Sequence, residues 1–231
     1  MANARFSSNF HCVENLHEVI YITKEMNFMP NSLVHLKVAN EISKKYVELD
    51  CPQYYLGIIA PDTVNLYGFA EKSKRWAAHI RAKDLNIWEN NIIEFYKQNI
   101  EEYDNKYLFG YLIHVLTDIV FDRIYEKELL DKIHTRGEFE DEFGYYHQEL
   151  RKYEASQIEE KWWKEVVEKL NKAVGIEINS IDADEIEKWR DKKIKEYDGK
   201  EKMKADMINQ ELIQRAANQV EEILIKNNIM K

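Results

Sequence analysis

Residues that interrupt helices are rare in this chain, which has seven glycines and three prolines among 231 residues. An all-β protein needs such residues at short intervals to form its turns. Lysine, glutamate, isoleucine, leucine and alanine are frequent instead, a composition typical of helical proteins. The length suffices for one large domain or two small ones. The sequence therefore predicts an all-α fold built as a bundle of several helices.

Apolar residues recur at helical spacing through most of the chain. We expect helices from Ser32 to about 49 and at about 87–99, 106–130, 139–172, 183–197 and 202–227. Ser32 is the expected N-cap of the first helix, and Ser180 and Asp182 are candidate caps of the helix at 183–197. Pro61 and Asp62 open an irregular segment, so we expect Asp62 to be presented from a loop.

Three segments of the chain differ in character. Residues 1–28 form a weakly patterned N-terminal extension, 29–150 a helical core with the ionisable residues discussed below, and 151–231 a set of charged helices. The last two helices keep an apolar stripe among many glutamates and lysines, so they should pack on the core or form a homodimer. Their mixed charge lacks the basic face of a helix that binds a membrane surface.

The net charge of −9 and the absence of a basic stripe argue against a nucleic-acid-binding surface. Residues 1–28 contain no apolar run of signal-peptide length, and no later segment approaches the length of a membrane span. Cys12 and Cys51 match neither a disulfide framework nor a zinc knuckle and are interpreted as ordinary thiols. We therefore expect a cytoplasmic protein in a reducing compartment.

The segment YLFGYLIHVLTDIVFDRIY at 107–125 is mostly apolar yet carries His114 and Asp118 four residues apart. This spacing places both side chains on one face of a helix, within reach of one metal ion. An ionised Asp118 turned inward is costly unless it is paired or bound to a metal. A buried hydrogen bond between the two residues would also satisfy both, so the pair alone leaves two interpretations open.

Other residues of the same types are ambiguous when taken singly. His35 lies on the apolar face of its helix and His79 follows Trp76, and each is more often a hydrogen-bonded core histidine than a ligand. Asp62 after Pro61 is commonly a cap or an Asx-turn. A second pair at i, i+4 spacing, His134 and Glu138, stands in polar surroundings that favour an exposed position.

Four blocks of the sequence follow one another within about residues 29–135: MPNSLVHLKVA, YYLGIIAPDTV, AAHIR and YLFGYLIHVLTDIVFD. In this order they resemble the zinc-dependent phospholipase C family, and in particular its short bacterial members. No single block is diagnostic, so the resemblance rests on their common order. It implies an all-helical fold, shared with fungal single-strand nucleases, that holds up to three zinc ions in a cleft and hydrolyses phosphoesters.

The resemblance also implies a ligand set. His35 is similar to the ligand on the family's first conserved helix, Asp62 to its loop carboxylate and His79 to its next histidine. His114 and Asp118 are similar to the paired ligands of the long helix, with Asp118 as the candidate bridge between two metals.

The later part of the ligand set matches the family less well. His134 with Glu138 is similar to the His–Glu pair of another zinc site, but the histidine expected between Asp118 and this pair is absent. Asp122 lies in that region as a candidate substitute. The secreted phospholipases also ligate zinc through their N-terminal amino group, which residues 1–28 make implausible here. We therefore expect one to three zinc ions, or another divalent metal.

Zinc would lower the pKa of its bound water to about 7 and so supply hydroxide at neutral pH. Asp62 would orient or deprotonate this water, which makes it the candidate catalytic residue. Candidate substrate contacts are neighbours of the proposed ligands: Tyr55, Tyr67, Trp76 and Arg81. The expected substrate is a small phosphoester or a phospholipid headgroup.

Two other functions fit the same residues. The absent ligands favour a non-catalytic helical protein with a structural or vestigial metal site and a protein-partner role. Such a protein would have a closed site with four ligands. A phosphohydrolase acting on nucleotides would use similar groups, but the adjacent His–Asp dipeptide expected there is absent from this chain.

Overall fold

The computed structural model describes residues 30–136, 142–198 and 200–231. Over these ranges the chain folds into helices joined by turns and irregular segments, and no residue there belongs to a strand. The predicted all-α class is confirmed. No helix in the described part of the chain combines the length and the apolar character needed to cross a membrane.

The first half of the chain supplies most of the interior. It contains α2 (Ser32–Ser43), η1 (Val47–Leu49), α3 (Pro52–Ile59), η2 (Pro61–Asn65), α4 (Lys72–Ala78), α5 (Leu85–Asn99) and α6 (Asn105–Ile124). Helix α6 continues through a π-helical turn, η3 (Tyr125–Leu129), into α7 (Leu130–Arg136). The second half contains α8 (Glu142–Gln157), α9 (Lys161–Leu170), α10 (Ala183–Tyr197) and α11 (Gln210–Lys226).

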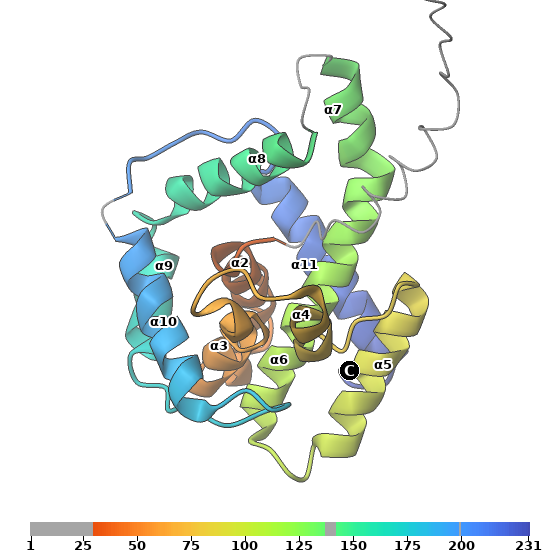
Figure 1. Cartoon of the computed structure of the whole chain (residues 1–231), viewed down its shortest axis with the longest axis vertical. Helices are drawn as coiled ribbons and strands as arrows, with labels where there is room; N and C mark the ends of the chain where they lie inside the picture. Colours follow the sequence, from red (N-terminus) through yellow and green to blue (C-terminus); the bar gives the residue numbers. More distant parts are fainter. Residues whose placement is uncertain (1–29, 137–141, 199) are drawn as a thin grey trace, which may run out of the picture.

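Helix α6 is the centre of the fold and contacts α2, α3, α5 and α11 (Figure 1). It packs most closely against α3, where Gly57 and Gly110 face each other. A Cβ atom on either glycine would overlap the backbone of the opposite helix, so only glycine permits this approach. The contact brings the backbone of α3 close enough to α6 to accept a hydrogen bond from one of its side chains.

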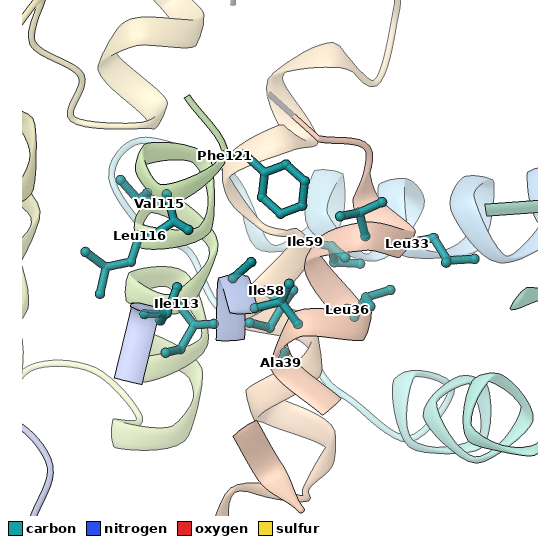
Figure 2. Close-up of a cluster of buried hydrophobic side chains, with 14 of the residues drawn as sticks. Leu33, Leu36, Ala39, Ile58, Ile59, Ile113, Val115, Leu116 and Phe121 are labelled. Carbon is teal, nitrogen blue, oxygen red and sulfur yellow. The ribbon is translucent and has the colours of Figure 1, made fainter. Parts of the chain in front are cut away.

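Apolar side chains fill the space between α2, α3 and α6, as Figure 2 shows. Leu36, Ile58 and Phe121 are among them, and each is at most 1% exposed. Full burial of an apolar side chain of this size stabilises a fold by roughly 1.5–3 kcal/mol. The ionisable residues of these helices are therefore held by a densely packed interior.

The helices of the second half cover this core. Helix α11 packs on α2 and α6, while α9 and α10 pack on α3 and α8 packs on α2 (Figure 1). The predicted apolar stripe of α11 is buried, including Leu212, Val220 and Leu224. The expected domain boundary at residue 150 falls inside α8, so the two predicted segments share this helix.

Several helix boundaries differ from the expectation. Asn31, and not Ser32, precedes α2, and its side chain donates to Glu154 (3.0 Å) and does not cap the helix. Helix α2 also ends at Ser43, before the expected end at residue 49. The stretch expected at 139–172 is divided, because α8 ends at Gln157 and α9 begins at Lys161. By contrast, α10 spans the expected 183–197, with Asp182 at its N-cap.

Helix α11 begins at Gln210 and not near residue 202. The Asn209 side chain accepts a hydrogen bond from the backbone of Leu212 (2.9 Å) and so caps the helix. Before it, Glu149 accepts hydrogen bonds from the amides of Asp206 (2.6 Å) and Met207 (2.7 Å). These tertiary contacts hold the preceding residues in a non-helical conformation that the local pattern did not indicate.

Candidate metal centre

Five residues from four elements converge at the centre of the fold. His35 lies on α2, Asp62 on η2, His79 at the C-cap of α4, and His114 and Asp118 on α6. Two groups of three among them have ligand atoms within 4.8 Å of one another: His35 with His114 and Asp118, and Asp62 with His79 and His114. The expectation of a loop at Asp62 is wrong, because Pro61 begins a 3₁₀ turn there.

Backbone carbonyl groups orient two of the histidines. His114 Nδ1 lies 2.6 Å from the carbonyl oxygen of Ile58, and His79 Nδ1 lies 2.8 Å from that of Arg75. A carbonyl oxygen only accepts hydrogen bonds, so each Nδ1 carries a hydrogen and each neutral ring has a lone pair on Nε2. The two Nε2 atoms lie 3.2 Å apart. Two lone pairs at this distance repel each other. The pair is stabilised by a cation, either a proton on one ring or a metal ion that both rings ligate.

The two carboxylates complete a set of donors around this point. Asp118 Oδ2 lies 3.5 Å from His114 Nε2 and 3.6 Å from His79 Nε2, and Asp62 Oδ1 lies 3.6 Å from His79 Nε2. A tetrahedral zinc with bonds of about 2.0–2.2 Å separates its ligand atoms by about 1.63 times that length, roughly 3.3–3.6 Å. The spacing of His79, His114 and Asp118 (3.2–3.6 Å) therefore suits a tetrahedral zinc ion, and Asp62 lies at a similar distance from one of the three.

His35 occupies a different position in the cluster. Its Nε2 lies 3.1 Å from the carbonyl oxygen of Pro30, which makes this nitrogen the donor, and 3.2 Å from Asp118 Oδ1. The ring stacks on His114 with centroids 3.8 Å apart. In this arrangement His35 orients Asp118 and His114, which is the role of a supporting residue in a metal site.

Burial and charge act in opposite directions on the aspartates. Burial alone would raise the pKa of Asp118, but His35 and His114 hold that pKa well below its usual range. Burial would also raise the pKa of Asp62, but His79 and His114, in their protonated forms, lower that pKa to about 2. Both carboxylates are ionised at neutral pH. Two negative charges that are largely shielded from solvent repel each other, which favours a cation between them.

The cluster is closed on most sides. The side chains of His35, His114 and Asp118 are fully buried and that of His79 is 1% exposed, whereas that of Asp62 is 14% exposed. Ser32 donates a long hydrogen bond to Asp62 Oδ2 (3.4 Å). Asp62 is therefore the residue of the cluster that is most exposed to solvent.

Asp122, one turn beyond Asp118, is not part of the cluster. It accepts a hydrogen bond from Arg81 Nη2 (2.8 Å), and burial raises its pKa to about 7 against the opposing charge of Arg81. His134 is exposed on α7. Glu138 lies outside the described residues. The structure thus brings together five of the eight proposed ligands.

The four candidate substrate contacts also differ in their positions. Tyr55 is buried, and its hydroxyl group is engaged with Asp50 and Asn40. Tyr67 is 79% exposed, and Trp76 lies on α4 beneath the Arg81 guanidinium group, which is 5.8 Å from the ring centroid. These contacts tie Tyr55 to the fold and leave Tyr67 on the surface. Their role towards a substrate stays a prediction.

The sequence carried no signal for some of the groups that orient the cluster. The carbonyl oxygens of Pro30, Ile58 and Arg75 belong to residues whose side chains are irrelevant to this role. Only the packing of α3 against α6 and the end of α4 bring two of them to the imidazole rings.

The fold and the cluster define the class of protein: an all-α chain with a buried His–Asp group that can hold a metal ion. No protein-family model, no curated protein and no solved structure matches the chain. A more particular assignment therefore has to rest on the geometry of the site.

Proposed function

We propose that this protein is a metal-dependent hydrolase of phosphoesters, with zinc as the first candidate for its ion. The observation that carries the proposal is the pair of Nε2 atoms of His79 and His114, 3.2 Å apart with both lone pairs directed at each other. Asp118 adds a carboxylate oxygen 3.5 and 3.6 Å from these two nitrogens, and Asp62 adds one 3.6 Å from His79 Nε2. The resemblance of four sequence blocks to zinc-dependent phospholipase C supports the choice of reaction.

A divalent ion held there would supply Lewis acidity, because it lowers the pKa of water to about 7 and offsets charge on phosphate oxygens. The residues of the chain have separate tasks. Asp62, at the solvent-facing edge, would orient the attacking water or take its proton. Asp118 and His114 would anchor the ion, and His35 would keep Asp118 in place through its Nε2 group.

A second function is favoured by the burial of the cluster. His79, His114 and Asp118 have donor atoms at spacings that suit one tetrahedral ion, and Asp62 would be the fourth donor, at the position that a catalytic zinc keeps open for water. If Asp62 stays bound, the site is closed and the metal is structural, with the protein acting through a partner. The partial exposure of Asp62 supports the catalytic alternative, because Asp62 is the most exposed of the five donors.

The expected substrate is a small phosphoester or a phospholipid headgroup, since a bound cation lets an acidic protein accept an anion. The cytoplasmic location and a homodimer through α10 and α11 stay predictions of the sequence.

The test begins with the metal content of protein purified without chelators. We expect at least one zinc or similar ion per chain, and none in His114→Ala or Asp118→Ala. His134→Ala, which removes an exposed histidine of α7, is the matched control and should keep the ion. Wild-type protein without any metal would remove the proposal.

Activity is tested separately with a chromogenic phosphodiester, a phosphocholine ester and single-stranded nucleic acid. Hydrolysis that requires the ion and falls in Asp62→Asn supports the catalytic function. A metal-loaded protein that is inactive on all three substrates, with the ion unable to exchange a water ligand, supports the structural alternative.

A further inference from the structure

The end of α4, which carries His79, adopts a backbone conformation that its sequence disfavours. The amide of Arg81 donates to the carbonyl of Trp76 (2.9 Å) and the amide of Ile80 to that of Ala77 (3.1 Å). This pair of hydrogen bonds is the Schellman motif, in which the residue after the C-cap is left-handed and is usually glycine or asparagine. Here that residue is Ile80, with φ +52°. A β-branched side chain is strained in this region.

The same motif ends α11 with a suitable residue. The amide of Asn228 donates to Ile225 (3.0 Å) and that of Ile229 to Leu224 (2.9 Å), and the left-handed residue is Asn228 (φ +57°). Asparagine tolerates this conformation because its short polar side chain bonds locally. At the end of α11, which carries no residue of the cluster, the left-handed position holds a residue that tolerates it. At the end of α4, directly after His79, the same position holds a strained residue.

Strain of this kind persists only where surrounding contacts hold the backbone in place. Arg81 supplies the contact on one side of Ile80: its Nη2 donates to Asp122 on α6 (2.8 Å), and its guanidinium group lies 4.2 Å from the ring centroid of Trp88. On the other side, Trp88 Nε1 donates to the carbonyl oxygen of His79 (2.8 Å). The turn is thus fastened to α5 and α6 on both sides of the strained residue.

This arrangement points the His79 ring at the cluster. Its Nδ1 hydrogen reaches the Arg75 carbonyl and its Nε2 faces His114 Nε2. We propose that Arg81, through its contacts with Asp122 and Trp88, is the positioning residue that holds the strained Ile80 turn and so presents His79 to the metal. This inference rests on the proposed metal centre, and it gives Arg81 a role other than the substrate contact that the sequence suggested.

The strain predicts a specific dependence between the two residues. Without the Arg81 contact, the turn relaxes to an unstrained conformation and His79 leaves the cluster, so an ion has to rebuild the turn as it binds. When residue 80 tolerates the left-handed region, the turn is not strained and does not relax. Loss of the Arg81 contact should then weaken zinc binding less.

The experiment measures zinc affinity by competition with a chromogenic chelator. Arg81→Met should bind zinc about 10- to 100-fold more weakly than wild type, the range for supporting residues of metal sites. Ile80→Asn should bind about as tightly as wild type, and in the Ile80→Asn background Arg81→Met should lose much less affinity. Asp122→Asn, which keeps the shape of the side chain, should show the same trend if Arg81→Met folds poorly.

Arg123→Met is the matched control, because Arg123 also joins α5 and α6, through an ion pair with Glu89 (2.8 Å) and a hydrogen bond to Asn86 (3.2 Å). Its zinc affinity should equal that of wild type. Affinity that is unchanged in both Arg81→Met and Asp122→Asn would overturn the proposal. An equal loss from Arg81→Met in the wild-type and the Ile80→Asn backgrounds would overturn it as well.

A second readout needs no metal. In metal-free Arg81→Met the amides of Ile80 and Arg81 should exchange hydrogen at least about tenfold faster than in wild type, and Ile80→Asn should restore slow exchange. If wild-type protein binds no ion, the proposed function fails, yet the exchange rates still decide whether Arg81 holds the turn. Unchanged exchange in Arg81→Met would contradict that role.

Discussion

Two regions of this protein bury carboxylates in different ways. On α8, Glu149 accepts hydrogen bonds from Lys152 and from two backbone amides, and Glu154 accepts from Tyr197 (2.7 Å) and Asn31 (3.0 Å). On α6, neither oxygen of Asp118 accepts a well-aligned hydrogen bond within the described residues, and three imidazole nitrogens lie 3.2–3.6 Å from these oxygens.

The difference separates a structural carboxylate from one that suits a cation. A buried carboxylate with donors on both oxygens holds elements together and needs nothing further. Asp118 faces His79 and His114, whose Nδ1 hydrogens are already used by backbone carbonyls, and His35, whose Nε2 hydrogen is used by the carbonyl of Pro30. The negative charge of Asp118 is therefore balanced only when a proton or a metal ion joins the cluster. The comparison predicts that the two regions respond differently to metal, to mutation and to pH.

The largest expected difference concerns removal of the ion. Binding to the folded state at about 1,000 times Kd stabilises a protein by about 4 kcal/mol. For a chain of this length, 1 kcal/mol corresponds to about 2–4 °C in Tm, so a chelator should lower the Tm by roughly 10 °C. Scanning calorimetry with and without chelator measures this. The Tm of Asp118→Asn should not change when the chelator is added, whereas that of Glu154→Gln should fall as in wild type. An identical change in Tm for both variants would contradict the difference between the two regions.

The next effect is on stability without metal. Glu149→Ala leaves the amides of Asp206 and Met207 without their acceptor. Only the hydrogen bond of Met207 is buried, and an unsatisfied buried group costs about 1–3 kcal/mol. We expect about 1–3 kcal/mol less stability in urea unfolding and an unchanged zinc affinity. Lys152→Met removes only a partly exposed partner of Glu149 and should cost below about 1 kcal/mol. A drop in zinc affinity in Glu149→Ala would show that the two regions are coupled.

The smallest effect is in the pH dependence. Burial raises the pKa of Glu154, against the hydrogen bonds from Tyr197 and Asn31. Its neutral form is therefore favoured by folding, so the stability it contributes is complete below its unfolded pKa of about 4.5 and is lost as pH rises through the folded pKa. One group contributes a slope of at most about 1.4 kcal/mol per pH unit. Urea unfolding from pH 4.5 upward should show a flatter profile for Glu154→Gln; parallel profiles would argue against the raised pKa.

Much of the fold followed from local pattern. The scarcity of glycine and proline predicted the all-α class, and apolar spacing located α5, α10 and the buried stripe of α11. The pattern failed where tertiary contacts override local preference. Helix α4 was not expected, and Asn31 uses its side chain on Glu154 in place of capping α2.

The residues of the candidate centre also divide into those that local pattern predicted and those that it did not. The spacing of His114 and Asp118 placed both on one face of α6, because that relation depends only on helical geometry. The convergence of His35, Asp62 and His79 with them depends on how α2, η2 and α4 pack on α6, and the sequence suggested it only through resemblance. Asp122 was expected near the ligands, but its contact with Arg81 is a relation between distant segments that no local spacing encodes.

By itself, the sequence determined that this chain forms helices and which of its ionisable side chains lie on apolar faces, because both depend on residues a few positions apart. Only the tertiary structure decided which nitrogen of each imidazole faces the cluster and which buried carboxylate lacks a donor. Those properties depend on carbonyl and amide groups from other helices, such as Ile58 against His114 and Met207 against Glu149, whose positions arise from packing.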